Sequence, residues 1–189
     1  MVVSIRTLAG IRHLLGRAMD AGSPLLGALG GVEEAGTARV RMVVIRRFDP
    51  RLMTVAVSTD GRSGKVKQLQ SHPRSELCIW LGEPRISLRL LTEWCIITVN
   101  TASKADQVVL EEFWRAHSAA SQGLFLMPPP GGPYRRNGKC LLPKHPPKTF
   151  AMLCGRIVEI DALYIRSSGQ ERWMYGRSES GWRKRRVNP

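Results

Sequence analysis

The segment STDGRSGKVKQL, at positions 58–69, concentrates side chains that can bind a phosphate group. It offers three hydroxyls, a glycine that permits close backbone approach and an ammonium group: Ser58, Thr59, Ser63, Gly64 and Lys65. The residues that follow read as a short helix over about 64–72 with Ser63 at its N-cap, and the N–H groups at such a helix start attract anions. The segment therefore predicts a site for a terminal monophosphate, with a polar turn capped by Ser63 as the structural alternative.

The same segment does not fit the phosphate loop of nucleotide triphosphatases. That loop needs a glycine five positions before its Gly-Lys pair, and a serine or threonine directly after the lysine to hold magnesium. Thr59 and Val66 stand at those two positions. The sequence therefore favours a metal-free site, built from hydroxyls, backbone N–H groups and one ammonium.

A positive charge interrupts an aliphatic strand upstream of this segment. In RVRMVVIRR, at 39–47, the alternation of a strand puts Arg41 on the same face as Val43 and Ile45. An unpaired guanidinium in such a strand would be costly, so Arg41 should have an anionic partner. Asp60 or a glutamate could serve, and so could a phosphate contacted from the end of the next strand.

The balance of charge is strongly basic, with 29 Lys and Arg against 15 Asp and Glu and a formal net charge of +14. Apart from RKRR at 183–186, the cations are spread along the chain. The five tryptophans are not interleaved with them, as a stacking platform for nucleic acid requires. This distribution does not favour nucleic acid as a partner, and an anionic small ligand accounts for part of the excess equally well.

The sequence contains four cysteines: Cys78, Cys95, Cys140 and Cys154. They form no CxxC pair and have no histidine at zinc spacing, which predicts reduced thiols in a cytoplasmic protein and no metal site. No apolar run approaches the ~20 residues that cross a bilayer, so we expect no membrane partner. Three arginines before the first acid, Asp20, would suit a mitochondrial transit peptide, but apolar residues at three- and four-residue steps favour a first helix within 1–22.

Short aliphatic runs separated by Gly, Asp and Pro dominate the rest of the chain and indicate antiparallel strands. We expect strands at 24–31, 38–48, 52–59, 75–82, 86–100, 149–161, 171–176 and 182–187. We expect further helices at 64–72 and 104–117. A proline-rich loop covers 128–148. With 189 residues, we expect a single domain over 1–189, mainly β with flanking helices, in the form of a closed or nearly closed barrel that leaves few exposed strand edges.

A series of fragments resembles the pyridoxamine 5'-phosphate oxidase-like family of FMN-binding split barrels, from about Ser23 to the C-terminus. The fragments occur in the family's order: RMVVIRRFDPR, STDGRSGKVKQLQSHPRSELCIWL, SLRL, FWRAHSAASQ and QERWMYGRSESGWRKRRVNP. The resemblance implies a six-stranded antiparallel split barrel and a homodimer with FMN between the subunits. The proline-rich MPPPGGP segment is similar to a flavoprotein branch of the family whose substrates are mostly unassigned.

The resemblance also implies roles for particular residues. The FMN phosphate would be held by Arg41 and Lys65, with help from Ser63 and Arg62. Further flavin contacts would come from Met42, Val43, Val44, Arg46, Ser58, Thr59, Gly64, Ser87 and Arg172. Ser87 stands where the family has a flavin-contacting glutamine, and Thr92 where it has a strand glycine.

The substrate positions of the family are altered in this chain. Pyridoxamine phosphate oxidases hold their substrate with a Lys, Tyr, Arg and Ser set and a late Arg-x-His pair. The corresponding residues here are Arg46, Phe113, His117, Ser121, Ser168 and Gln170. Only Ser121 is retained, and a histidine that is largely neutral at pH 7 replaces a bidentate guanidinium, so we expect a substrate other than pyridoxamine phosphate.

The leading expectation is an FMN-dependent oxidoreductase in which the flavin carries the redox chemistry. Its catalytic residues are not identified, and His117 is the best candidate for a general base. A module that stores or senses FMN without turnover is one alternative. A split barrel that binds haem or nucleic acid is another.

Overall fold

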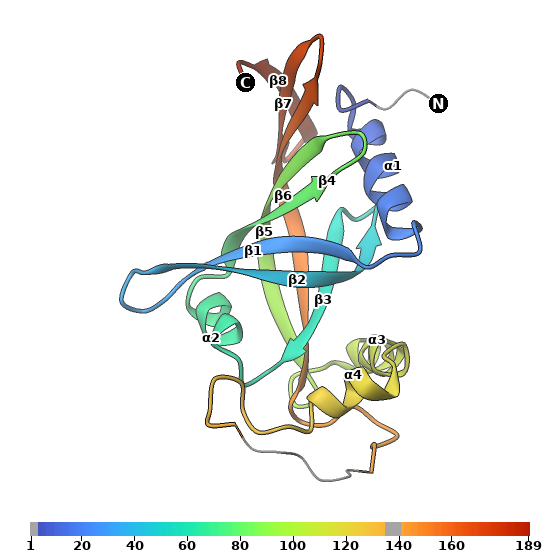
Figure 1. Ribbon diagram of the computed structural model, residues 1–189, viewed down its shortest axis with the longest axis vertical. Coiled ribbons are helices and arrows are strands. Elements are labelled where there is room, and N and C mark those ends of the chain that lie inside the picture. The colour runs from blue at the N-terminus through green and yellow to red at the C-terminus, as the bar shows by residue number, and fades with distance from the viewer. Residues whose placement is uncertain (1–3, 135–140) are drawn as a thin grey trace.

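The computed structural model describes residues 4–134 and 141–189, and six of its strands close into an antiparallel barrel (Figure 1). These strands are β1 (Leu25–Val32), β2 (Ala38–Asp49), β3 (Thr54–Asp60), β4 (Arg74–Leu81), β5 (Ile86–Thr98) and β6 (Phe150–Arg166). Their order around the barrel is β3-β2-β1-β4-β5-β6, and β6 returns to pair with β3. The expectation of a mainly β, six-stranded antiparallel barrel with flanking helices is confirmed.

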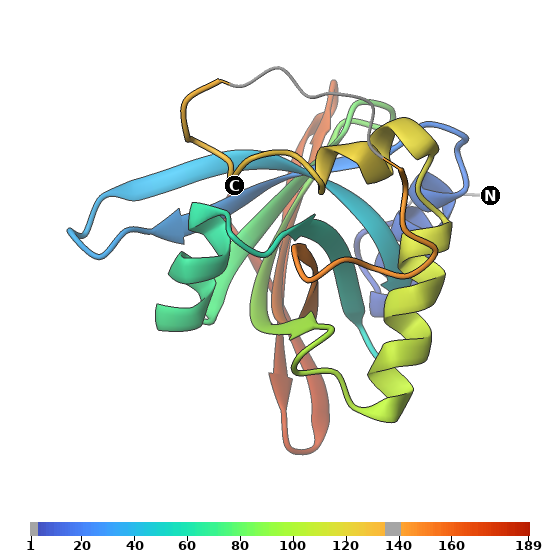
Figure 2. The same cartoon turned by 90° about the horizontal axis from the view of Figure 1, so that it is seen from below.

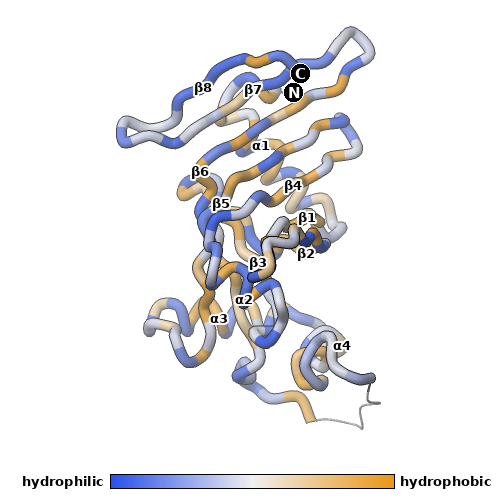
Figure 3. The backbone as a smooth tube through the Cα atoms, turned by 90° about the vertical axis from the view of Figure 1, so that its left-hand side faces the viewer, coloured by the Kyte–Doolittle hydropathy of each residue, from blue (hydrophilic) through white to orange (hydrophobic). Residues whose placement is uncertain are grey.

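Strand β6 is long enough to pair with two different strands along one of its edges. Its first half pairs with β3, from Phe150 to Arg156, and its second half pairs with β7 (Gly169–Ser178), which continues into β8 (Gly181–Val187). The expected strand at 149–161 therefore ends five residues too early, because residues 162–164 remain in ladders with both β5 and β7 and residues 165–166 remain paired with β7. Figure 3 shows the β7–β8 hairpin at one end of the molecule, coloured mainly hydrophilic.

The barrel interior is filled by alternate residues of each strand. In β4, Leu77 and Ile79 are fully buried while their neighbours Cys78 and Trp80 face outward. In β2, Val43 and Ile45 are buried, and Val40 and Met42 are exposed, as the alternation predicts. Burying each such aliphatic side chain contributes about 1.5–3 kcal/mol, so this core fixes the register that positions the site.

Within the residues that the structure describes, four helices flank the barrel: α1 (Leu8–Met19), α2 (Gly64–Ser71), α3 (Lys104–Arg115) and α4 (Ala119–Leu124). The first begins inside the expected 1–22 segment because the Thr7 hydroxyl accepts a hydrogen bond from the Gly10 N–H, and it buries Ile11 and Leu15. Seen from below, α2 and α3 lie on opposite sides of β3 (Figure 2). Among the described residues, no helix is long and apolar enough to span a membrane.

A second apolar cluster lies outside the barrel, between the sheet and α3. It consists of Ala56, Leu110, Phe113, Trp114, Phe125, Phe150 and Met152. The sequence did not predict α4, which starts where the Ser118 hydroxyl accepts from the N–H of Ser121. Its C-cap residue, Phe125, belongs to this cluster. The described parts of the 128–148 loop contain no helix or strand, and residues 135–140 of that loop lie outside the described residues.

Candidate functional site

Lys65 lies in the first turn of α2, next to the end of β3. Its ammonium group donates to the hydroxyl of Thr59 at 2.8 Å and to that of Ser63 at 3.2 Å. Three of the residues expected to bind phosphate therefore lie together. Ser63 stands at the N-cap position as expected, but its hydroxyl makes no capping hydrogen bond to α2, because it faces the lysine instead.

Arg41 reaches α2 from near the start of β2. Its Nη1 donates to Oε1 of Gln68 at 2.6 Å, and this glutamine is buried one turn after Lys65. The expected anionic partner is absent from the part of the chain that the structure describes, where Arg41 forms no ion pair with a carboxylate. Asp60, one candidate for that role, pairs with Arg62 at 2.6 Å.

The charge of Arg41 acts on the ammonium group of Lys65. Burial, and then the nearby positive charge of Arg41, lower the pKa of Lys65, and Asp60 only partly opposes this. A half-buried ammonium beside a half-buried guanidinium is an unfavourable arrangement in the absence of an anion. A bound anion would neutralise both groups.

There is room for such an anion at the start of α2. A side chain built on Gly64 would meet no atom within 4 Å, so the approach to the first backbone N–H groups of the helix is open. On the β1 side, a Cβ on Gly31 would come within 2.7 Å of Gln68 Oε1 and 3.5 Å of Arg41 Nη1. The absence of a side chain at Gly31 therefore leaves the space that the Arg41–Gln68 pair occupies. The ammonium of Lys65, the guanidinium of Arg41 and the N–H groups at the start of α2 are donors that fit a phosphate group.

Arg62 is directed away from this group. Its guanidinium donates to both carboxylate oxygens of Asp60 and to the carbonyl oxygen of Met127 at 2.7 Å. The hydrogen bonds neutralise its charge and tie the turn after β3 to the loop after α4. The structure gives Arg62 the role of holding this turn, a contact that its position in the sequence did not reveal.

A second polar group lies on the other face of β3. Because adjacent strand residues point to opposite faces, Thr59 meets Lys65 while Ser58 meets His117. The Ser58 hydroxyl and His117 Nε2 are 2.8 Å apart, and His117 Nδ1 lies 2.6 Å from the carbonyl oxygen of Phe113. Since that carbonyl can only accept, Nδ1 carries the proton and Nε2 accepts from Ser58.

The surroundings keep His117 neutral. Its ring packs edge-on against Phe125 and Phe150, and only 8% of the residue is exposed. Burial lowers its pKa below 6.5, the carbonyl of Phe113 opposes this, and the charge of Arg46 lowers it further. A neutral imidazole with both nitrogens engaged acts here as a fixed hydrogen-bonding group.

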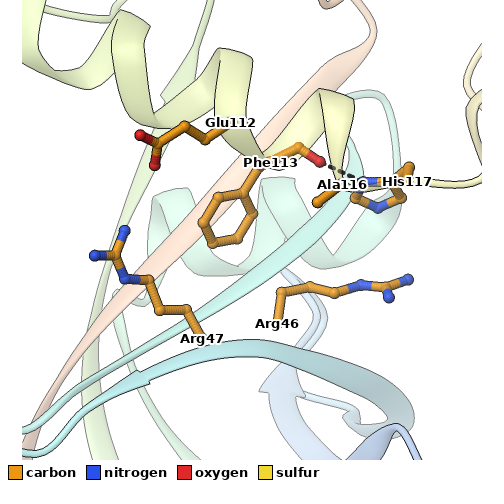
Figure 4. A pocket seen from close by; sticks show the side chains of 6 residues that line it. All are labelled: Arg46, Arg47, Glu112, Phe113, Ala116 and His117. Atoms are coloured by element: carbon orange, nitrogen blue, oxygen red, sulfur yellow. Dashed lines mark hydrogen bonds between the residues drawn. The ribbon is translucent and has the colours of Figure 1, made fainter.

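His117 is part of a pocket of about 390 Å³ between β2 and α3 (Figure 4). The lining residues are Arg46, Arg47, Glu112, Phe113, Ala116 and His117. The β2–β3 register shifts between Ile45 and Arg47, so this bulge allows two consecutive arginines to line the same pocket. Figure 4 shows Arg47 extending toward the Glu112 side of the pocket and Arg46 toward His117. The arrangement suits a small molecule with an anionic group.

The other expected flavin residues are spread over the outer face of the sheet. Met42 and Val44 point outward from β2, whereas the side chain of Val43 is buried in the barrel, which leaves only its backbone accessible. Ser87 pairs with Leu163, and Leu163 pairs with Arg172 on β7. Arg172 donates to Asp161 at 2.7 and 2.9 Å. Figure 1 places β7 at one end of the molecule and α2 toward the other, so a single chain does not gather all these residues.

The expected substrate residues are also divided. Phe113 and His117 line the pocket, and Ser121 lies in α4, where it accepts a hydrogen bond from Ser118. Gln170 lines a separate cavity beside the C-terminal residues 186–189. The sequence expectation missed Arg47, Glu112 and Ala116 of the pocket, since neither the strand bulge nor the packing of α3 on β2 has a local signal.

Comparisons with known proteins agree with this geometry. The sequence pattern described as "Pyridoxamine 5'-phosphate oxidase, FMN-binding domain" matches residues 15–98. A curated protein of Arabidopsis thaliana, pyridoxine/pyridoxamine 5'-phosphate oxidase 2, is 27% identical over 160 residues, which cover 79% of each chain.

Solved structures give the same assignment. A pyridoxamine 5'-phosphate oxidase-related, FMN-binding protein of Nostoc punctiforme superposes with a TM-score of 0.85 and 26% identity over 100% of both chains. PhzG of Burkholderia lata, solved with tetrahydrophenazine-1-carboxylic acid, has a TM-score of 0.75 at 15% identity and covers 96% of this chain and 92% of its own, a similarity of fold. The chain is thus similar, in sequence over residues 15–98 and in fold over its whole length, to the pyridoxamine 5'-phosphate oxidase-like FMN-binding proteins.

Proposed function

We propose that this protein binds FMN as its cofactor and acts as an FMN-dependent oxidoreductase on a small anionic molecule. The observation that carries the proposal is the pair of cations at the start of α2. Arg41 and Lys65 are hydrogen-bonded to neutral groups, and burial together with the charge of Arg41 lowers the pKa of Lys65. A phosphate monoester provides the negative charge that this pair lacks.

FMN suits these surroundings beyond its phosphate. The ribityl chain and ring would extend along β2, where Met42 and Val44 offer apolar side chains and the bulge at Arg46 frees part of the backbone. Bound there, the flavin supplies hydride and electron transfer. The protein's part is to hold the phosphate with Lys65 and Arg41 and to hold the substrate against the ring.

The pocket between β2 and α3 is the proposed substrate site. Arg46 and Arg47 would bind an anionic group of the substrate, and Phe113 would contact its apolar part. His117 would position Ser58 rather than remove a proton, because both of its ring nitrogens already have partners. With phenylalanine and a neutral histidine in this pocket, the substrate differs from pyridoxamine phosphate.

A second copy of the chain would complete the flavin site. An apolar sheet face on β1, β2 and β4 is exposed and consists of Leu26, Val40, Met42 and Trp80. Ser87 and Arg172 lie farther along the same side of the sheet. We propose a homodimer in which this face is buried and Arg172 of one copy reaches the flavin held by the other.

A non-catalytic FMN-binding protein is the second candidate. The observation that favours it is the absence, within the described residues that line the pocket, of a histidine with a ring nitrogen available to take a proton. Steady-state oxygen consumption with candidate amines, and reduction by nicotinamide cofactors, would separate the two functions.

The decisive test of cofactor binding is to release the molecule that copurifies with the protein and to determine its mass by mass spectrometry. We expect the mass of FMN and a visible flavin spectrum that the double variant Arg41→Met/Lys65→Met lacks. Lys67→Met, an exposed lysine on the same helix, is the matched control and should retain the flavin. A Soret band, or equal flavin occupancy in the double variant, would refute the proposal.

A further inference from the structure

Two cysteines that are 59 positions apart in the sequence face one another across β5 and β6. Cys95 and Cys154 are direct partners in this antiparallel ladder. Directly opposed residues in such a ladder have Cα atoms about 4.5–5.5 Å apart, within the range of about 4.4–6.8 Å that disulfides span. Both side chains lie on the same face of the sheet, because paired residues point to the same side.

The register continues beyond the two thiols. Ala56 on β3 pairs with Cys154, and Arg47 on β2 pairs with Ala56, so a row of four residues crosses four strands. Cys154 is partly buried against the apolar cluster under α3, whereas Cys95 is exposed. The row thus places one accessible thiol beside one sheltered thiol.

The environment divides the two thiols into an attacking and a resolving group. A hydrogen bond from the Cys154 thiol, assisted by backbone N–H groups, lowers the pKa of Cys95 to about 6, although burial and Asp106 act in the opposite direction. The same hydrogen bond and burial raise the pKa of Cys154, and Arg47 only slightly opposes this. Thiolates are the nucleophilic form of cysteine, so Cys95 is the group that reacts first.

We infer that Cys95 and Cys154 are a redox-active pair that hydrogen peroxide converts into an intrachain disulfide. The Cys95 thiolate attacks one peroxide oxygen, the O–O bond breaks, and the departing hydroxide takes a proton to form water. Cys154 then attacks the resulting sulfenic acid, an S–S bond forms, the S–O bond breaks, and a second water leaves. In total, two thiols and one peroxide give one disulfide and two waters, with two electrons passing from sulfur to oxygen.

The new bond would join β5 to β6 beneath α3. Ala56 and Phe113 of the neighbouring cluster connect Cys154 to the pocket that holds Arg46 and His117. The inference does not depend on the cofactor or the substrate, because the two thiols are brought together by the barrel ladder alone.

Peptide mapping tests the inference on the wild-type chain. Trypsin should place each cysteine in its own peptide, at 75–85, 90–104, 140–144 and 149–156. After peroxide treatment and alkylation in denaturant, we expect the alkylated thiols to fall from four to two per chain. Peptides 90–104 and 149–156 should then appear joined, and a reductant should separate them.

Variants check the order of the two steps. Cys154→Ser should leave a sulfenic acid on Cys95 that dimedone labels. Cys95→Ser should leave the Cys154 thiol of peptide 149–156 reduced and open to alkylation. Cys78→Ser, which changes a partly buried thiol outside the pair, is the control and should form the same disulfide as wild type. Linkage of Cys95 to another cysteine, a disulfide between two chains, or no linkage at a dose that labels Cys95 in Cys154→Ser would overturn the inference.

Discussion

Lys65 and Arg41 approach one another at the start of α2, and each donates to neutral oxygens, Lys65 to Thr59 and Ser63, and Arg41 to Gln68. Two neighbouring positive charges lower the free energy of unfolding unless an anion binds between them. Burial first, and then the charge of Arg41, lower the pKa of Lys65. The group is therefore better suited to a bound phosphate than to the protein alone.

Replacing Lys65 by Met should weaken FMN binding while the protein remains folded. A hydrogen bond to a charged group contributes about 1.5–3 kcal/mol, a factor of roughly 10–150 in Kd. Fluorescence titration of the apoprotein with FMN measures the change, and Lys67→Met should bind as tightly as wild type. An unchanged Kd in Lys65→Met would remove Lys65 from the phosphate site.

The stability of the apoprotein should increase as the pH rises toward 10.5. In the folded chain Lys65 loses its proton at a lower pH than in the unfolded chain, so the unfolded state binds more protons between the lowered pKa and 10.5. The increase in the free energy of unfolding that comes from Lys65 is less than about 1.4 kcal/mol per pH unit. Urea unfolding at pH 7.5 and 9.5 should show this gain in wild type and Lys67→Met, and a smaller one in Lys65→Met. FMN affinity should change in the opposite sense and fall at high pH.

The sequence was sufficient for the parts of the fold and site that depend on near neighbours. Alternation of apolar residues predicted which side of β2 is buried. Thr59, Ser63 and Lys65 meet because they lie within seven consecutive residues, from the end of β3 to the start of α2. Gln68 was within reach of the same reasoning, since it lies one helical turn after Lys65 and so shares its face.

Contacts between distant segments could not be predicted in this way. The Ser58–His117 pair joins residues 59 positions apart, and it forms only because α3 packs on the outside of β3. The bulge at Arg46 is set by the pairing of β2 with β3, so no local pattern indicates that Arg47 would line the pocket. The resemblance to the family supplied a list of residues but not their division between two regions of the chain.

Replacing Ser58 by Ala should destabilise the protein, and the cost should shrink once the pH is low enough to protonate His117 in the folded chain. The neutral His117 ring accepts from the Ser58 hydroxyl, and losing such a bond costs about 1 kcal/mol. Burial lowers the pKa of His117 in the folded chain, so the ring stays neutral there after the unfolded state has begun to take up the proton below about 6.5. The Ser58 hydroxyl favours the neutral ring, so wild type should lose more stability on acidification than Ser58→Ala. Urea unfolding of both proteins over a series of acidic pH values, with NMR titration of the His117 ring and the exposed Ser180→Ala as control, measures the difference. A cost that stays the same through the pH at which the folded His117 ring takes up its proton would mean that Ser58 acts independently of His117.

Replacing Met42 by Lys should dissociate the proposed homodimer and weaken FMN binding together. Met42 is 62% exposed in the single chain and lies within the apolar sheet face, so a buried lysine there would lose its hydration without gaining a partner. Leu124→Lys is the matched control, since Leu124 is 63% exposed but lies on α4, away from that face. Light scattering during size-exclusion chromatography gives the mass, and FMN titration gives the affinity. If Arg172 of a second copy contacts the flavin, Arg172→Met should weaken FMN binding in the dimeric wild type and have no effect in the Met42→Lys background. A dimer that persists in Met42→Lys, or that is lost in Leu124→Lys, would place the interface on another surface.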